Sequence, residues 1–245
     1  MAWGPTICFL LNTFTFLPLI VLLFMMHTEN RRAELEKMDR KSGTGMLAGY
    51  LYAIQTPRIR NMLIVASIAG FLVAPYILLM PVYAKDAVNA GAASLGLLMA
   101  IAGVGSVLGA LWAAGTNDNR RDMLIAVSVV AGAAGLLGLS LFTALPLALI
   151  LVFIIGIFDT MTPTLVNTAL QVETEDRYLG RVMSLLTLLL LGAPRIGVLI
   201  LGALAEVTSI TVALGASALT CLIVGGAIAL LLLKRRNAAA QALAD

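Results

Sequence analysis

Long apolar runs separated by short charged segments dominate this chain. Seven runs have the length of roughly 20 residues that an α-helix needs to cross the hydrocarbon core of a bilayer. None shows the ten-residue alternation of apolar and polar positions that is typical of a transmembrane β-strand. The pattern therefore predicts an all-α membrane protein with seven transmembrane helices. We place them at residues 5–26, 62–83, 94–114, 123–142, 147–170, 182–204 and 210–233.

The basic residues between these runs predict the orientation of the chain. The segments after the first, third, fifth and seventh runs hold seven, two, two and three basic residues, whereas the opposite segments hold only Lys85. Basic residues concentrate in cytoplasmic loops. No basic residue precedes the first run and no small-residue cleavage site follows it, so we do not interpret it as a signal peptide. We expect the N-terminus outside and the C-terminus, with a disordered tail at 234–245, in the cytoplasm.

The longest polar segment, residues 27–60, contains a short apolar periodicity. Met46, Leu47, Tyr50, Leu51 and Ile54 recur at helical spacing, and Pro57 follows them. This predicts an amphipathic helix that lies along the cytoplasmic interface. For residues 28–44 an ordinary solvated linker is the alternative.

Composition supports a membrane protein and argues against several other classes. The chain is 60% hydrophobic and 12% charged, against about a quarter charged in soluble proteins. Cys8 and Cys221 lie in apolar runs, and His27, the single histidine, ends the first run. These residues predict neither a disulfide nor a metal or other cofactor. We find no nucleophile–base pair, phosphate-binding loop or basic nucleic-acid patch, so we expect neither an enzyme nor a nucleic-acid partner.

Two full charges interrupt the fifth and sixth runs. Asp159 and Arg195 each lie about 20 Å along their predicted helices, near the middle of the bilayer. A charge at this depth costs at least about 2.5–3.5 kcal/mol, so it needs a partner or a wet cavity. We hypothesise that the two residues form an ion pair or jointly line a polar site; a purely structural ion pair is the alternative. Further candidates for a substrate or ion pathway are Tyr76, Thr162, Asn167 and Gln171.

Several segments resemble a known family. They are Pro75–Tyr83 (PYILLMPVY), Gly103–Leu111 (GVGSVLGAL), Asn167–Gln171 (NTALQ) and Leu179–Ser184 (LGRVMS). In their order and spacing, the last six runs resemble the C-terminal half of a major facilitator superfamily transporter, in the subgroup of enterobactin-exporter-like proteins and transmembrane secretion effectors.

The resemblance implies a fold, a domain organisation and a function. Residues 61–233 would form a six-helix bundle of two inverted three-helix repeats, and residues 1–26 would match the last helix of an N-terminal half. Residues 27–60 would connect the two, and 234–245 would form a cytoplasmic tail. The implied function is proton-coupled efflux of a small amphipathic molecule, such as a siderophore or drug, across the inner membrane by alternating access.

The chain also departs from the family pattern. By this resemblance we expect the first five of twelve helices to be missing, and Asp118-Asn-Arg-Arg121 stands where the family has Asp-Arg-x-Gly-Arg-Arg. Besides the bilayer and a small-molecule substrate, we therefore expect an N-terminal half chain or a second copy as partner. A non-transporting scaffold and an inactive gene remnant are the alternatives. Charges at the cytoplasmic ends are candidate gate residues, or simple membrane anchors in the case of Arg120 and Arg121. The gate candidates are Asp118, Arg120, Arg121, Asp176, Arg177 and Arg181.

Overall fold

The computed structural model describes residues 46–88 and 91–242, together with isolated helical positions between residues 13 and 25. Apart from those positions, the predicted first span lies outside the described residues, as do Cys8, His27 and the segment 28–44. Residues 1–45 form one unit, and residues 46–245 form a second unit that contains all the spanning helices of the described chain.

Six stretches of the described chain are long and apolar enough to cross a membrane. Their number and order match the last six predicted spans, and no strand occurs among the described residues, so the predicted all-α membrane fold is confirmed. The first stretch consists of α4 (Pro57–Leu72), α5 (Tyr76–Val82) and the π-helix η1 (Tyr83–Ala87). The others are α6 (Ala92–Ala114), α7 (Asp118–Leu141), α8 (Leu145–Glu173), α9 (Asp176–Val207) and α10 (Ile210–Ala242). The short helix α3 (Met46–Gln55) precedes them.

The helices extend further into the charged segments than the apolar pattern predicts. α7 begins at Asp118 and α9 at Asp176, where an acidic side chain interacts favourably with the helix dipole. The expected charged turns therefore shrink to residues 115–117 and 174–175. The expectation of a disordered tail at 234–245 is wrong up to Ala242, because α10 continues through an alanine-rich segment of high helix propensity.

The first spanning stretch is broken at Val73–Pro75, between α4 and α5. Pro75 has no N–H to donate to the carbonyl of Phe71. Ser217 of α10 donates a hydrogen bond to the neighbouring carbonyl of Leu72. Gly197 of α9 lies so close that an added β-carbon would clash with the Phe71 carbonyl and lie 2.6 Å from the Pro75 ring. Neighbouring helices thus stabilise the break, as membrane bundles require.

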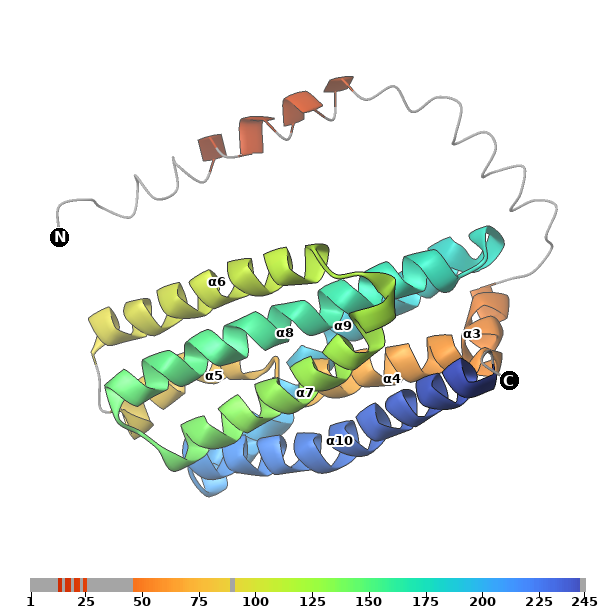
Figure 1. The fold of residues 1–245 in the computed structure, drawn as a ribbon. Coiled ribbons are helices and arrows are strands. Elements are labelled where there is room, and N and C mark those ends of the chain that lie inside the picture. Colours follow the sequence, from red (N-terminus) through yellow and green to blue (C-terminus); the bar gives the residue numbers. More distant parts are fainter. Residues whose placement is uncertain are drawn as a thin grey trace. The chain divides into compact units, whose positions relative to one another are not determined.

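α6 packs against α8 through backbone contacts at glycines (Figure 1). A β-carbon added to Gly109 would lie 2.8 Å from the carbonyl carbon of Ile157, and one added to Gly156 would lie 2.5 Å from the carbonyl oxygen of Ala102. Gly105 similarly contacts the carbonyl of Phe153. Gly105 and Gly109, a pair of small residues four positions apart, thus let the backbones of α6 and α8 approach closely.

The helix contacts follow the arrangement expected of two three-helix repeats. α6 packs on α8 as α9 packs on α4, and α7 packs on α8 as α10 packs on α4. α7 and α10 pack on each other. Exchanging the first three spans for the last three therefore reproduces the main contacts. Separately, α4, α8 and α9 line a common cavity.

Candidate transport site

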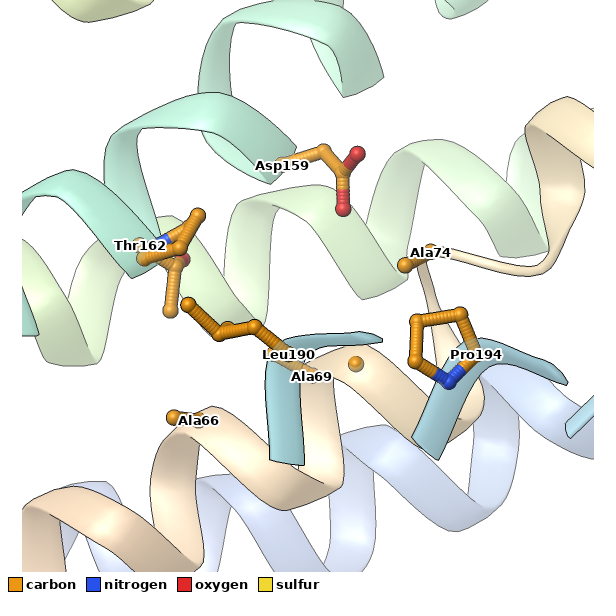
Figure 2. Close-up of a pocket in the computed structure, with 9 residues that line it drawn as sticks. Ala66, Ala69, Ala74, Asp159, Thr162, Leu190 and Pro194 are labelled. Atoms are coloured by element: carbon orange, nitrogen blue, oxygen red, sulfur yellow. The ribbon is translucent and has the colours of Figure 1, made fainter. Parts of the chain in front are cut away.

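The carboxylate of Asp159 lines a cavity of about 220 Å³ between α4, α8 and α9. Figure 2 shows the carboxylate directed from α8 into the space beside Ala74 and Pro194. The cavity lies next to the break after α4, at the level of the two prolines inside α8 and α9. Its lining residues are Ala66, Ala69, Gly70, Ala74, Asp159, Thr162, Pro163, Leu190 and Pro194.

Small residues and prolines create this cavity. Ala66, Ala69 and Gly70 share one face of α4, because residues three and four apart are neighbours on a helix. Pro163 and Pro194 have no N–H and cannot donate to the carbonyls of Asp159 and Leu190, four residues earlier. The residues around the cavity therefore supply hydrogen-bond acceptors and few donors.

Among the described residues, none forms a hydrogen bond or ion pair with the Asp159 carboxylate. Tyr76 of α5 is buried and does not line the cavity. Thr162, one turn further along α8, is 2% exposed. Its hydroxyl donates to the carbonyl of Phe158 at 3.0 Å and lies 2.8 Å from the hydroxyl of Ser128 on α7. Thr162 is thus engaged with protein groups, whereas the Asp159 carboxylate is available to a ligand or a proton.

The hypothesised ion pair between Asp159 and Arg195 is absent from this structure. Arg195 is exposed on α9, and its guanidinium donates to the carbonyl of Leu191 on its own helix. Leu190 and Pro194 face the cavity, and the next residue in each case, Leu191 or Arg195, points about 100° around the helix. Arg195 directly follows Pro194, which lines the cavity, but its side chain lies on an exposed face of α9.

Asn167 and Gln171, the other pathway candidates on α8, do not line this cavity. The side-chain amide of Gln171 donates to Asn167 one turn earlier, and Gln171 is exposed. The structure therefore places Asp159 and Thr162 at this cavity, whereas the other pathway candidates do not line it. These are Tyr76, Arg195, Asn167 and Gln171.

At one end of the bundle, Arg58 connects three helices. Its guanidinium lies 3.3 Å from the carboxylate of Asp122 on α7 and 2.7 Å from that of Glu173 on α8. Close by, Arg121 is buried and pairs with Asp118. Sequence reasoning missed the roles of Arg58 and Glu173. No local pattern in the sequence could have revealed them, because the partners lie 64 or more positions apart in the chain.

Among the remaining gate candidates, Asp176, Arg177 and Arg181 lie at the start of α9, beside α3, whereas Arg120 lies in the first turn of α7. Arg177 pairs with Glu175 at 2.8 Å and lies over the ring of Tyr178, 4.6 Å from its centroid. The ring of Tyr178 stacks on Tyr52 of α3 at 4.3 Å. Arg181 packs against Gly49 of α3, whereas Asp176 and Arg120 are exposed. Among the described residues, no ion pair joins this group to the Arg58 group.

A family model described as transmembrane secretion effector matches residues 1–245, the full length of the chain. The chain belongs to the transmembrane secretion effector family. It is also similar to the enterobactin exporter EntS of Shigella flexneri, with 27% identity over 195 residues. That match covers 78% of this chain and 45% of the exporter, so the chain spans about half the length of this relative.

Three of the segments that resemble the family lie at contacts between helices of this chain. Gly103–Leu111 forms the part of α6 that packs on α8, and Pro75–Tyr83 begins at the helix break beside the cavity. Leu179–Ser184 contains Arg181, which contacts α3. The resemblance is confirmed, and its motifs serve helix packing more than they supply the polar groups of the cavity.

Proposed function

We propose that this chain is part of a proton-coupled secondary transporter that exports a small amphipathic molecule. One observation carries the proposal: the Asp159 carboxylate faces a cavity between three apolar helices and has no ionic partner among the described residues. An intramembrane carboxylate is costly when charged. A group of this kind becomes neutral when it is occluded, and it ionises when the cavity opens to water.

A single carboxylate suits a proton better than a metal ion. Hard cations require several oxygen ligands at defined distances, whereas a proton needs one carboxylate oxygen. Protonation of Asp159 removes its charge and favours the state in which α4, α8 and α9 close around it. Deprotonation favours the state in which water enters. This difference in proton affinity between two conformations is sufficient to couple proton movement to alternating access.

The exposed charge of Arg195 favours a polar substrate pathway along the exposed face of α9. A guanidinium at mid-span that contacted lipid tails would be unfavourable, and its one hydrogen bond in the structure is to its own helix. The exposed side chains of Leu191 and Leu199 flank it on the same side of α9. We propose that this face meets a polar pathway whose opposite wall comes from an N-terminal half chain or from a second copy.

In this proposal the charged end of the bundle forms the cytoplasmic gate. The C-terminus lies on the same, cytoplasmic side of the inner membrane. The Arg58, Asp122 and Glu173 group ties α4, α7 and α8 together. Breaking these ion pairs in one state and forming them in the other would bias the two conformations. The exported molecule is of the size and character of a siderophore or drug, as the similarity to an enterobactin exporter suggests.

Export is tested in a bacterial strain that lacks its own enterobactin and multidrug exporters. The chain is expressed alone and together with the N-terminal half of a full-length secretion effector, and cell-associated enterobactin and ethidium are measured. We expect lower accumulation of at least one compound when the opposite wall is supplied. Asp159→Asn should abolish the effect, and Thr168→Ala, an exposed position on the same helix, should preserve it. Unchanged accumulation of both compounds with all chains present in the membrane would contradict the proposal.

A further inference from the structure

Helix α3 packs one face firmly against the end of the bundle (Figure 1). Ala53 is buried, and Gly49 lies so close to Arg181 of α9 that an added β-carbon would clash with that side chain. The ring of Tyr52 stacks on Tyr178, and the backbone N–H of Glu175 donates to the Tyr52 hydroxyl at 3.4 Å. α3 is therefore fixed to the first turns of α9.

The opposite face of α3 is apolar and has no protein partner among the described residues. Tyr50, Leu51 and Ile54 are 53%, 51% and 40% exposed. Their spacing places them on one side of the helix. The ten residues from Met46 to Gln55 carry no charge. Large side chains gathered in this way on an uncharged helix mark a surface that contacts something other than water.

The position of α3 identifies the bilayer surface as its partner. Only Thr56 separates α3 from Pro57, where the first spanning stretch begins. The helix thus lies at the level where the chain enters the membrane. Tyrosine is favoured at this depth, and apolar faces of interfacial helices insert about 5–10 Å into the boundary between headgroups and acyl chains.

Arg60 supplies a positive charge beside this face. Its guanidinium donates to the carbonyl of Ile54 at 3.4 Å, at the C-terminal end of α3. Arg58 and Arg177 have carboxylate partners, whereas Arg60 has none among the described residues. A basic group at this depth attracts the phosphate of an anionic lipid.

We propose that α3 is an interfacial anchor: Tyr50, Leu51 and Ile54 insert between lipid headgroups, and Arg60 binds the headgroup of an anionic phospholipid. The stack of Tyr52 on Tyr178 transmits this attachment to α9, which carries Leu190 and Pro194 of the cavity. The proposal does not depend on transport, because it concerns the attachment of one helix to the membrane surface.

Spin labelling of the full chain in phospholipid vesicles tests the location. Cys8→Ser and Cys221→Ala provide a cysteine-free background, and single cysteines replace Tyr50, Leu51 and Ile54. Collision with oxygen, which prefers lipid, is compared with collision with a water-soluble nickel complex. Labels at Arg120 and Val107, both exposed, serve as controls for the charged end of a helix and for the apolar part of a spanning helix. We expect an oxygen-to-nickel ratio at the three sites about threefold or more above that at Arg120 and below that at Val107.

Lipid composition tests the anionic headgroup. Replacing phosphatidylglycerol by phosphatidylcholine should lower the ratio at Ile54 about twofold, and Arg60→Gln should remove this dependence. A ratio equal to that at Arg120 would overturn the anchor, as would low collision rates with both reagents, which would show that protein covers the face. Equal ratios in both lipids would overturn the role of Arg60. Each of these results can occur whether or not the chain transports enterobactin or ethidium.

Discussion

Gly109→Ala should destabilise the bundle because it adds a methyl group where α6 meets the backbone of α8. The new β-carbon would lie 2.8 Å from the carbonyl carbon of Ile157 and closer still to its oxygen, whereas ordinary contact begins at 3.4 Å. The obstacle is backbone, so no side-chain rotation can relieve it and the two helices must separate. Overpacking lowers the free energy of unfolding by about 1–3 kcal/mol, and the higher helix propensity of alanine offsets about 0.5–1 kcal/mol of this loss. We expect a net loss of roughly 1–2 kcal/mol.

Gly103→Ala is the matched control on the same helix, because a β-carbon at Gly103 meets no atom within 4 Å. It should leave the stability unchanged or raise it by up to about 1 kcal/mol. The assay is unfolding of the purified chain in mixed micelles by increasing dodecyl sulfate, followed by far-ultraviolet circular dichroism. If the two variants unfold at the same dodecyl sulfate fraction, α6 and α8 do not pack through these glycines and the close contact is refuted.

Three further substitutions are measured by the same unfolding titration. Tyr83→Phe should cost about 1 kcal/mol, because the buried hydroxyl donates to the carbonyls of Leu139 and Phe142 at the end of α7; Tyr50→Phe, on an exposed tyrosine, should have no effect. Ser217→Ala should cost about 0.6–1.7 kcal/mol by removing the hydrogen bond to the Leu72 carbonyl, whereas Thr220→Ala, whose hydroxyl bonds only within α10, should cost less. Arg58→Gln should cost less than about 1 kcal/mol, because its side chain is 57% exposed. That loss should shrink in high salt, and a loss that salt does not change would contradict the ionic role.

The sequence predicts the number, order and approximate limits of the described spans because each requires about 20 apolar residues. The helix break is equally legible, since Pro75 removes a backbone donor wherever it occurs in a helix. The helix ends that lie within the charged segments are harder to predict from the sequence. A polar residue can continue a helix or end it, and Asp118 and Asp176 both turn out to begin helices.

The candidate site is only partly predictable, for a geometric reason. The depth of Asp159 and Arg195 follows from counting residues along a helix. The direction of each side chain depends on how each helix is rotated about its axis relative to its neighbours. The sequence of α9 does not show which face of this helix packs toward α8. The cavity therefore includes Asp159 but not Arg195. The contacts of Arg58 with Asp122 and Glu173 join residues 64 and more positions apart, which no local pattern indicates.

The central claim is that Asp159 carries the coupled proton, and transport in proteoliposomes tests it most directly. The chain is reconstituted with the N-terminal half, and two modes of enterobactin movement are compared: transport driven by a pH gradient and exchange between equal concentrations without a gradient. We predict that Asp159→Asn abolishes gradient-driven transport and preserves exchange, because asparagine resembles the protonated carboxyl group but cannot release a proton. Gradient-driven transport by Asp159→Asn at the wild-type rate would contradict the claim.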